Sequence, residues 1–188
     1  MTFSTLDTFY TVETRVAADD AVEFEAWQVH EHVPALLALD GYFGVRRFKE
    51  MSDEPSYLNL WHVDTRERFF SQARSDAVET PWKTRIAPRR SYLSVRFYRL
   101  GFSGGSDANF TELSLTDLTM SPQDAIAVTR EIAGRGPNTS VECLLSDDDE
   151  VPHRLLLATC PERRPWLSHG TMPVRRFRPI RAYQGREI

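Results

Sequence analysis

The sequence HEHVPALLALDGYF, residues 30–43, contains the end of a helix, a proline within it and the start of a strand. Because proline has no N–H, Pro34 cannot donate to the carbonyl of His30, and we expect the helix to kink or loosen there. Gly41 ends the connection to the strand. The segment therefore places the imidazoles of His30 and His32 on a core-facing helix, next to its bend.

The elements around this segment follow the order β-α-β-β-α-β, which is that of ferredoxin-like folds. The expected strands are rich in β-branched and aromatic residues and are bounded by turn residues. They cover residues 9–16, 42–49, 57–63 and 91–100. Helices are expected after Asp20 and Asp64, because each has a glutamate three residues later, the spacing of a capping box. Residues 1–100 are predicted to form one ferredoxin-like repeat with the His-x-Pro motif.

The same order of elements recurs in the rest of the chain. The second set of expected elements comprises strands over 110–116, 140–145, 153–159 and 174–183, a helix from Ser121 to about Gly134 and a short helix over 161–167. Glycine and serine in residues 101–106 indicate a linker. We therefore predict a second, degenerate repeat over residues 107–188, whose helix lacks the histidines.

A sheet with helices on one face leaves the other face bare. In both repeats these bare faces carry large residues, so we expect them to pack on each other. The predicted fold class is α+β, with two ferredoxin-like repeats forming one intrachain barrel and the helices outside.

Composition limits the partners that this chain is expected to have. The 188 residues are 41% hydrophobic and carry a formal net charge of −4, which gives no reason to expect nucleic acid. No apolar run approaches the ~18 residues of a membrane span, and the N-terminus does not resemble a signal peptide. We expect a cytoplasmic monomer or homodimer that acts on a small-molecule ligand, away from nucleic acid and membranes.

Cysteine usage and motifs favour chemistry without a bound metal or nucleotide. Cys143 and Cys160 are too few for a disulfide framework and lie in apolar runs, so we expect buried free thiols. The sequence contains neither a zinc-type Cys/His spacing, nor a P-loop, nor a GxGxxG motif. We therefore expect no metal and no cofactor.

The helix before Pro34 supplies the first candidate site residues. A helical wheel takes Val22, Val29 and Val33 as the centre of the buried face, with His30 and His32 on opposite flanks.

Two features favour His32. It shares a flank with Glu25, whose carboxylate at helical spacing is suited to orient the imidazole, and it immediately precedes the Val-Pro step. A neutral imidazole near physiological pH is the natural general base for a weakly acidic C–H or O–H. Trp27 lies further round the helix and is expected to be half exposed.

The strands supply the other candidates. Strand alternation places Tyr57, Asn59 and Trp61 on one face, while Glu13 and Arg46 add charge to faces expected to be buried. Such groups form either a structural polar network or the lining of a pocket for a flat, oxygenated ligand. We assign catalysis to His32 and Tyr57. The predicted substrate-binding residues are His30, Trp27, Trp61, Arg46, Asn59 and Glu13.

Residues 27–48, with the His-Val-Pro and Leu-Asp-Gly-Tyr steps, resemble the EthD-like branch of the dimeric α+β barrel superfamily. The resemblance covers residues 8–100 in motif and residues 107–184 in topology only. It implies the barrel described above, a pocket between helices and sheet, and His32 as the motif histidine. The fusion of two units and the loss of the motif in the second argue against a second active site.

The superfamily includes cofactor-free monooxygenases, polyketide cyclases, isomerases, decarboxylases and haem-degrading enzymes. The resemblance thus implies proton-transfer chemistry on an aromatic or carbonyl metabolite: isomerisation, cyclisation, decarboxylation or anthrone-type oxygenation. Two alternatives stay open. One is haem binding with His30, His32 or His62 as axial ligand, and the other is a binding module without catalysis.

Overall fold

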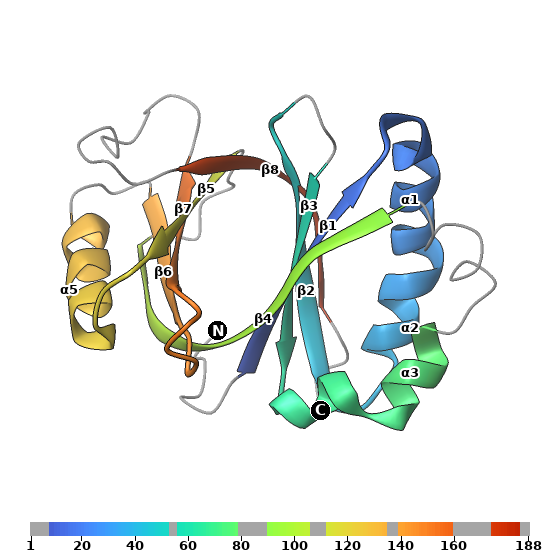
Figure 1. Ribbon diagram of the computed structural model, residues 1–188, viewed down its shortest axis with the longest axis horizontal. Helices are drawn as coiled ribbons and strands as arrows, with labels where there is room; N and C mark the ends of the chain where they lie inside the picture. Colours follow the sequence, from blue (N-terminus) through green and yellow to red (C-terminus); the bar gives the residue numbers. More distant parts are fainter. Residues whose placement is uncertain are drawn as a thin grey trace. The chain divides into compact units, whose positions relative to one another are not determined.

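The computed structural model describes residues 8–52, 56–78, 90–105, 112–134, 139–159 and 174–184 (Figure 1). The strands are β1 Thr8–Val16, β2 Tyr42–Glu50, β3 Ser56–Val63, β4 Arg90–Gly105, β5 Glu112–Leu118, β6 Thr139–Leu145, β7 His153–Thr159 and β8 Arg175–Gln184. They follow one another around a closed barrel in the order β1-β3-β2-β8-β5-β7-β6-β4. The predicted α+β barrel is confirmed.

The chain divides into two compact units. The N-terminal unit holds the described residues of 8–96 together with 180–184, and the C-terminal unit holds those of 97–179, so β4 and β8 each contribute to both. The N-terminal helical elements are a 3-10 turn Ala18–Asp20, α1 Ala21–Trp27, a π turn Gln28–His32, α2 Val33–Leu37, a 3-10 turn Arg66–Phe70 and α3 Gln72–Val78. The C-terminal unit contains α5, Pro122–Ala133. The helix expected over 161–167 lies outside the described residues.

The predicted linker differs from the structure. Residues 101–105 continue β4 and pair with β6, with Phe102 opposite Cys143 and Gly105 opposite Ser140. The glycines serve close packing here, because a Cβ at Gly101 would overlap the side chain of Leu145. Phe102 packs against the core of the C-terminal unit. A composition typical of a flexible linker is thus overridden by strand pairing with β6 and by one partly buried aromatic ring.

The helix loosens at the place where Pro34 removes a donor, as predicted. The Val33 N–H donates to the carbonyl of Gln28, five residues back, and the π turn ends immediately before α2. Pro34 is the second residue of α2, directly after the π turn.

The helical wheel placed the buried face wrongly. Val22 is 81% exposed, whereas Phe24 and Val33 are fully buried. In a regular α-helix, residues nine positions apart lie about 180° from each other, so Phe24 and Val33 would face opposite ways. The π turn between them changes the phase, and each half of the helix turns its own apolar residues to the sheet.

Helix capping follows the sequence at Ser121 but not at Asp20. The Asp124 N–H donates to Ser121 Oγ at 3.2 Å, so the predicted cap of α5 is confirmed. Asp20 has helical backbone angles and makes no side-chain cap hydrogen bond, because a 3-10 turn already precedes α1. The capping box predicted at Asp20 is therefore wrong.

The C-terminal unit has a core of its own between α5 and its sheet. The buried residues of this core are Leu118, Ala125, Ile132, Val141, Cys143, Leu145 and Leu155. Burial raises the pKa of the Cys143 thiol, as expected for an unreactive core cysteine. Cys160 lies outside the described residues. Within the described part of the chain, none of the helices has the length and apolar character needed to cross a membrane.

Gly41 makes the turn between α2 and β2 with a left-handed φ of +81°. A Cβ at this position would overlap the Arg68 guanidinium and the Asp64 carboxylate. We expect Gly41→Ala to lower the free energy of unfolding by about 1–2 kcal/mol from the left-handed backbone alone, with a further loss as the Arg68–Asp64 pair is displaced.

Urea denaturation measures this loss. Gly134→Ala is the matched control, because Gly134 has a φ of −73° and a Cβ there would lie 3.6 Å from its nearest neighbours. The control is expected to be neutral or slightly stabilising. Equal losses at the two glycines would contradict the role given to the Gly41 backbone.

Candidate functional site

The candidate site lies in the N-terminal unit, on the face of the sheet that α1 and the π turn cover. Residues directly opposite each other in antiparallel strands share a face. Tyr10 lies opposite Trp61, Arg47 opposite Asn59 and Lys49 opposite Tyr57. This set, with Tyr42 and Val45, forms what we call the helix-facing surface. Three predicted site residues of β3, namely Tyr57, Asn59 and Trp61, belong to it, and all three are buried.

His32 lies between two indole rings. Its imidazole is stacked on Trp27 at 4.4 Å between centroids and meets the ring of Trp61 edge-on at 6.0 Å. The π turn, of which His32 is the last residue, sets this orientation. The structure thus brings the predicted general base together with two predicted substrate-binding residues. His32 itself is half-buried, so the ring borders the packed layer rather than its centre.

Glu25 bonds to the sheet instead of to His32. The Tyr57 hydroxyl and the Lys49 ammonium both donate to Glu25 Oε1, each at 2.8 Å. Burial raises the pKa of Glu25, but these two hydrogen bonds outweigh it and hold the pKa below its ordinary value. The carboxylate is therefore ionised at neutral pH and fixes α1 to β2 and β3. The Glu25–His32 pairing expected from helical spacing is not the arrangement that the structure shows.

An amide pair makes a second connection between helix and sheet. Asn59 Nδ2 donates to Gln28 Oε1 at 3.3 Å, and both side chains are buried. Gln28 belongs to the π turn, so the loosened part of the helix carries both the amide and the imidazole of His32. A buried amide needs such a partner, because an unsatisfied polar group would cost about 1–3 kcal/mol.

Two predicted residues lie on the opposite face of the sheet. Glu13 is opposite Leu58, and Arg46 is opposite Leu60. They do not share a surface with His32, so the predicted residues do not all line one pocket. His30 is exposed on the helix.

The face of β2 was misjudged because the strand contains an irregularity. Its register shifts between Tyr42 and Gly44, which places Tyr42 on the same face as Val45 and Arg47. Arg47, rather than Arg46, therefore belongs to the helix-facing surface, and it is buried. A strict two-residue alternation along the sequence cannot reveal a bulge. Because Arg46 and Arg47 are the same residue type, nothing in the sequence shows which of them faces the helix.

Comparison with known proteins shows the fold and goes no further. No family model and no curated protein matches the chain. Its structure is similar to that of a "putative monooxygenase" from Fusobacterium nucleatum, with a TM-score of 0.67 and 9% identity over 97% of this chain and 96% of that one.

Two further solved structures show the same likeness. An anthrone oxidase-like protein matches with a TM-score of 0.60 and 9% identity, over 98% of this chain and 95% of that one. A mutant chlorite dismutase from Candidatus Nitrospira defluvii matches with a TM-score of 0.61 and 11% identity, over 94% and 93%. At these identities the likeness establishes the fold alone, an α+β barrel, and a fold of this kind can host several unrelated chemistries.

Proposed function

We propose that this chain is a small-molecule enzyme of the EthD-like kind, which uses His32 to move a proton on an aromatic or carbonyl-bearing metabolite without a cofactor. The observation that supports this most directly is the position of His32, with its imidazole between the rings of Trp27 and Trp61 at the border of the helix-facing surface. An imidazole is the side chain best matched to proton transfer near neutral pH.

The residues around His32 are arranged to position its imidazole. Trp27 and Trp61 limit the rotation of the ring by stacking and edge contact. Gln28 and Asn59 tie the π turn to β3, and Glu25 ties α1 to Tyr57. In this proposal His32 accepts a proton from a weakly acidic C–H or O–H, and the substrate keeps the electron pair as an enolate or phenolate. Tyr57 acts by positioning, since its hydroxyl proton is engaged with Glu25.

The structural neighbours are compatible with this chemistry without selecting one reaction. Two of the similar proteins are described as a monooxygenase and as anthrone oxidase-like. Isomerisation, cyclisation and anthrone-type oxygenation begin with removal of a proton from carbon or oxygen, which an imidazole can accept. In decarboxylation the carbanion left by loss of CO2 takes up a proton, which an imidazolium at the same position can donate.

The test is the loss of turnover when the imidazole is removed. With an anthrone or an enolisable aryl ketone as substrate, His32→Ala is expected to lower kcat by about 100-fold to 10,000-fold, the range for a general base. Glu31→Ala, an exposed change on the same π turn, is the control and should leave kcat unchanged.

Circular dichroism shows whether each variant is folded. Full turnover by folded His32→Ala would remove the proton-transfer role. Ligand binding that persists while no turnover is found in either protein would favour a binding module without catalysis.

The candidate histidines favour proton transfer over the haem alternative. An axial ligand needs an imidazole nitrogen open to the iron. The Nδ1 atom of His32 and the Nε2 atom of His62 are buried, and the His62 ring is stacked on Phe9 at 4.7 Å. His30 stands on the exposed side of the helix. One nitrogen each of His32 and His62 is thus withdrawn from a ligand, which makes haem binding the weaker of the two proposals.

A further inference from the structure

A second group of side chains at the helix-facing surface has the chemistry of an anion site. Arg74 of α3 places its guanidinium carbon 3.9 Å from the ring centroid of Phe69. The Phe69 ring lies 5.1 Å from Tyr10, and Tyr10 lies 6.5 Å from Tyr42, in both cases edge to face. We call Arg74, Phe69, Tyr10 and Tyr42 the Arg74 cluster.

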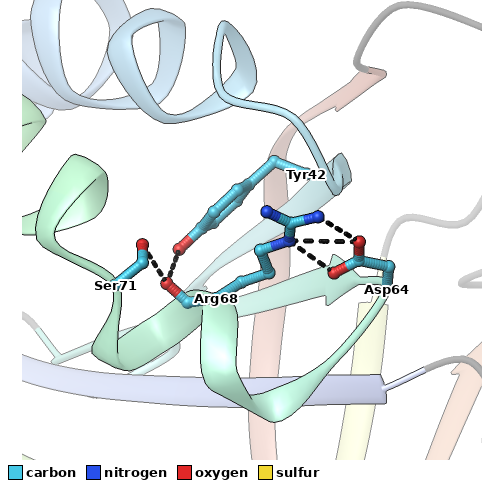
Figure 2. A network of polar contacts seen from close by, with 4 residues as sticks. All are labelled: Tyr42, Asp64, Arg68 and Ser71. Carbon is cyan, nitrogen blue, oxygen red and sulfur yellow. Dashed lines mark hydrogen bonds and ion pairs between the residues drawn. The ribbon is translucent and has the colours of Figure 1, made fainter.

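Arg74 differs from Arg68, which lies one helical element earlier, in the pairing of its guanidinium. Arg68 is paired with Asp64 through two of its nitrogens, at 2.8 and 2.7 Å, and its carbonyl accepts from Tyr42 and Ser71 (Figure 2). Among the described residues, no carboxylate forms an ion pair with Arg74, and its Nε atom is buried without a hydrogen-bond partner. A half-buried guanidinium that pairs with no carboxylate of the described residues favours a bound anion, because it presents donors only.

The two tyrosines add neutral donors. Burial raises the pKa of Tyr10 and of Tyr42, and Arg74 acts against this rise in both. Both phenols are thus protonated at neutral pH. The Tyr42 hydroxyl donates to the Arg68 carbonyl at 3.3 Å, a long bond that a charged acceptor can displace.

Trp61 connects the Arg74 cluster to the proposed base. Its ring is stacked with Tyr10 at 6.1 Å, meets Tyr42 edge-on at 5.8 Å and meets His32 edge-on at 6.0 Å. The anion site and the imidazole therefore contact the same indole.

We infer that Arg74, with the hydroxyls of Tyr10 and Tyr42, binds the carboxylate of a small aromatic acid. That this acid is the substrate of the chain rests on the proposed function. A carboxylate supplies two acceptor oxygens for the guanidinium and the phenols, and its aromatic ring matches the apolar surroundings. Among aromatic substrates, those that also carry a carboxylate are therefore expected to bind more tightly than their neutral counterparts.

The experiment compares a charged probe with its neutral isostere on the full chain. Benzoate and benzamide are titrated, and binding is followed by ligand-observed NMR. The intact protein is expected to bind benzoate about tenfold more tightly than benzamide, because only benzoate can accept charge-assisted hydrogen bonds with an ionised oxygen. Arg74→Gln should abolish this preference, and Arg74→Lys, which keeps the charge, should retain part of it.

Arg130→Gln is the matched control, because Arg130 also lies over a phenylalanine, Phe102, at 5.6 Å, but in the C-terminal unit. It should leave the preference intact. Thermal melting shows that each variant is folded. Equal binding of the two probes by the intact protein, or a preference for benzoate that survives in Arg74→Gln, would overturn the inference.

His32→Ala separates this inference from the proposed function. It should bind benzoate as the intact protein does, because the imidazole is not a member of the Arg74 cluster. Turnover that is indifferent to His32, together with benzoate binding that depends on Arg74, would refute the proposed function alone. Turnover that needs His32, with benzoate binding indifferent to Arg74, would refute the anion site alone.

Discussion

Replacing Trp61 by alanine is expected to lower the free energy of unfolding by about 3–5 kcal/mol, the cost of removing a large aromatic side chain from a core. Trp61 is 1% exposed, and its indole contacts Tyr10, Tyr42 and His32. In a close-packed core, the neighbouring side chains fill such a space only in part. The free energy of unfolding, measured in urea for both proteins, gives the difference.

Two further variants make the Trp61 result specific. Trp61→Phe keeps an aromatic ring and should cost clearly less than Trp61→Ala. Phe70→Ala removes a ring that is 65% exposed and should change stability by about 0.5 kcal/mol or less. A cost below about 1 kcal/mol for Trp61→Ala would be out of line with core truncations and would show that this indole is not packed as described.

The second large effect is expected in the C-terminal unit, at a buried arginine. Arg154 Nε donates to Asp117 Oδ1 at 3.0 Å, and the guanidinium carbon lies 5.6 Å from the ring centroid of Tyr98. The side chain of Arg154 is 2% exposed and that of Asp117 is 37% exposed. Asp117→Asn removes the counter-charge, so we expect a loss of about 2–4 kcal/mol, reduced from the value for a fully buried pair by the exposure of the carboxylate.

A double variant separates the lost pair from the buried charge that remains. Asp117→Asn with Arg154→Met should be more stable than Asp117→Asn alone, because the buried guanidinium that has lost the Asp117 carboxylate is then removed as well. Asp147→Asn is the control, since its partner Arg99 is 50% exposed and the pair should be worth less than about 1 kcal/mol. Equal losses for Asp117→Asn and Asp147→Asn, measured by urea denaturation, would contradict this account.

Regular patterns in the sequence predicted most of the fold. Seven of the eight strands were expected close to their observed positions, because period-2 alternation and turn residues mark them independently of context, whereas β4 continues through the predicted linker to Gly105. The shared face of Tyr57, Asn59 and Trp61 was predicted for the same reason, as β3 pairs with β1 without interruption. The cap at Ser121 was predicted from a strictly local signal.

The candidate site was predicted only in part, since local irregularities position it. The bulge at Tyr42 and Gly44 exchanges the faces of Arg46 and Arg47, and no residue type announces it. The π turn invalidates any wheel drawn at one constant angle. Gln28 and Lys49 were not candidates, because their roles depend on Asn59 and Glu25, which the fold brings from distant parts of the sequence.

The π turn divides one continuous helix into two segments that differ in the rotation of their buried faces about the helix axis. Phe24 and Trp27 are the buried residues of the first segment, and Val33 and Leu36 are those of the second. Each segment can therefore set the direction of its own buried face. Such a joint lets substitutions accumulate in one segment while the orientation of the other stays constant. His32 is the last residue of the π turn between the two segments, and its imidazole takes its direction from Trp27 of the first segment and Trp61 of β3.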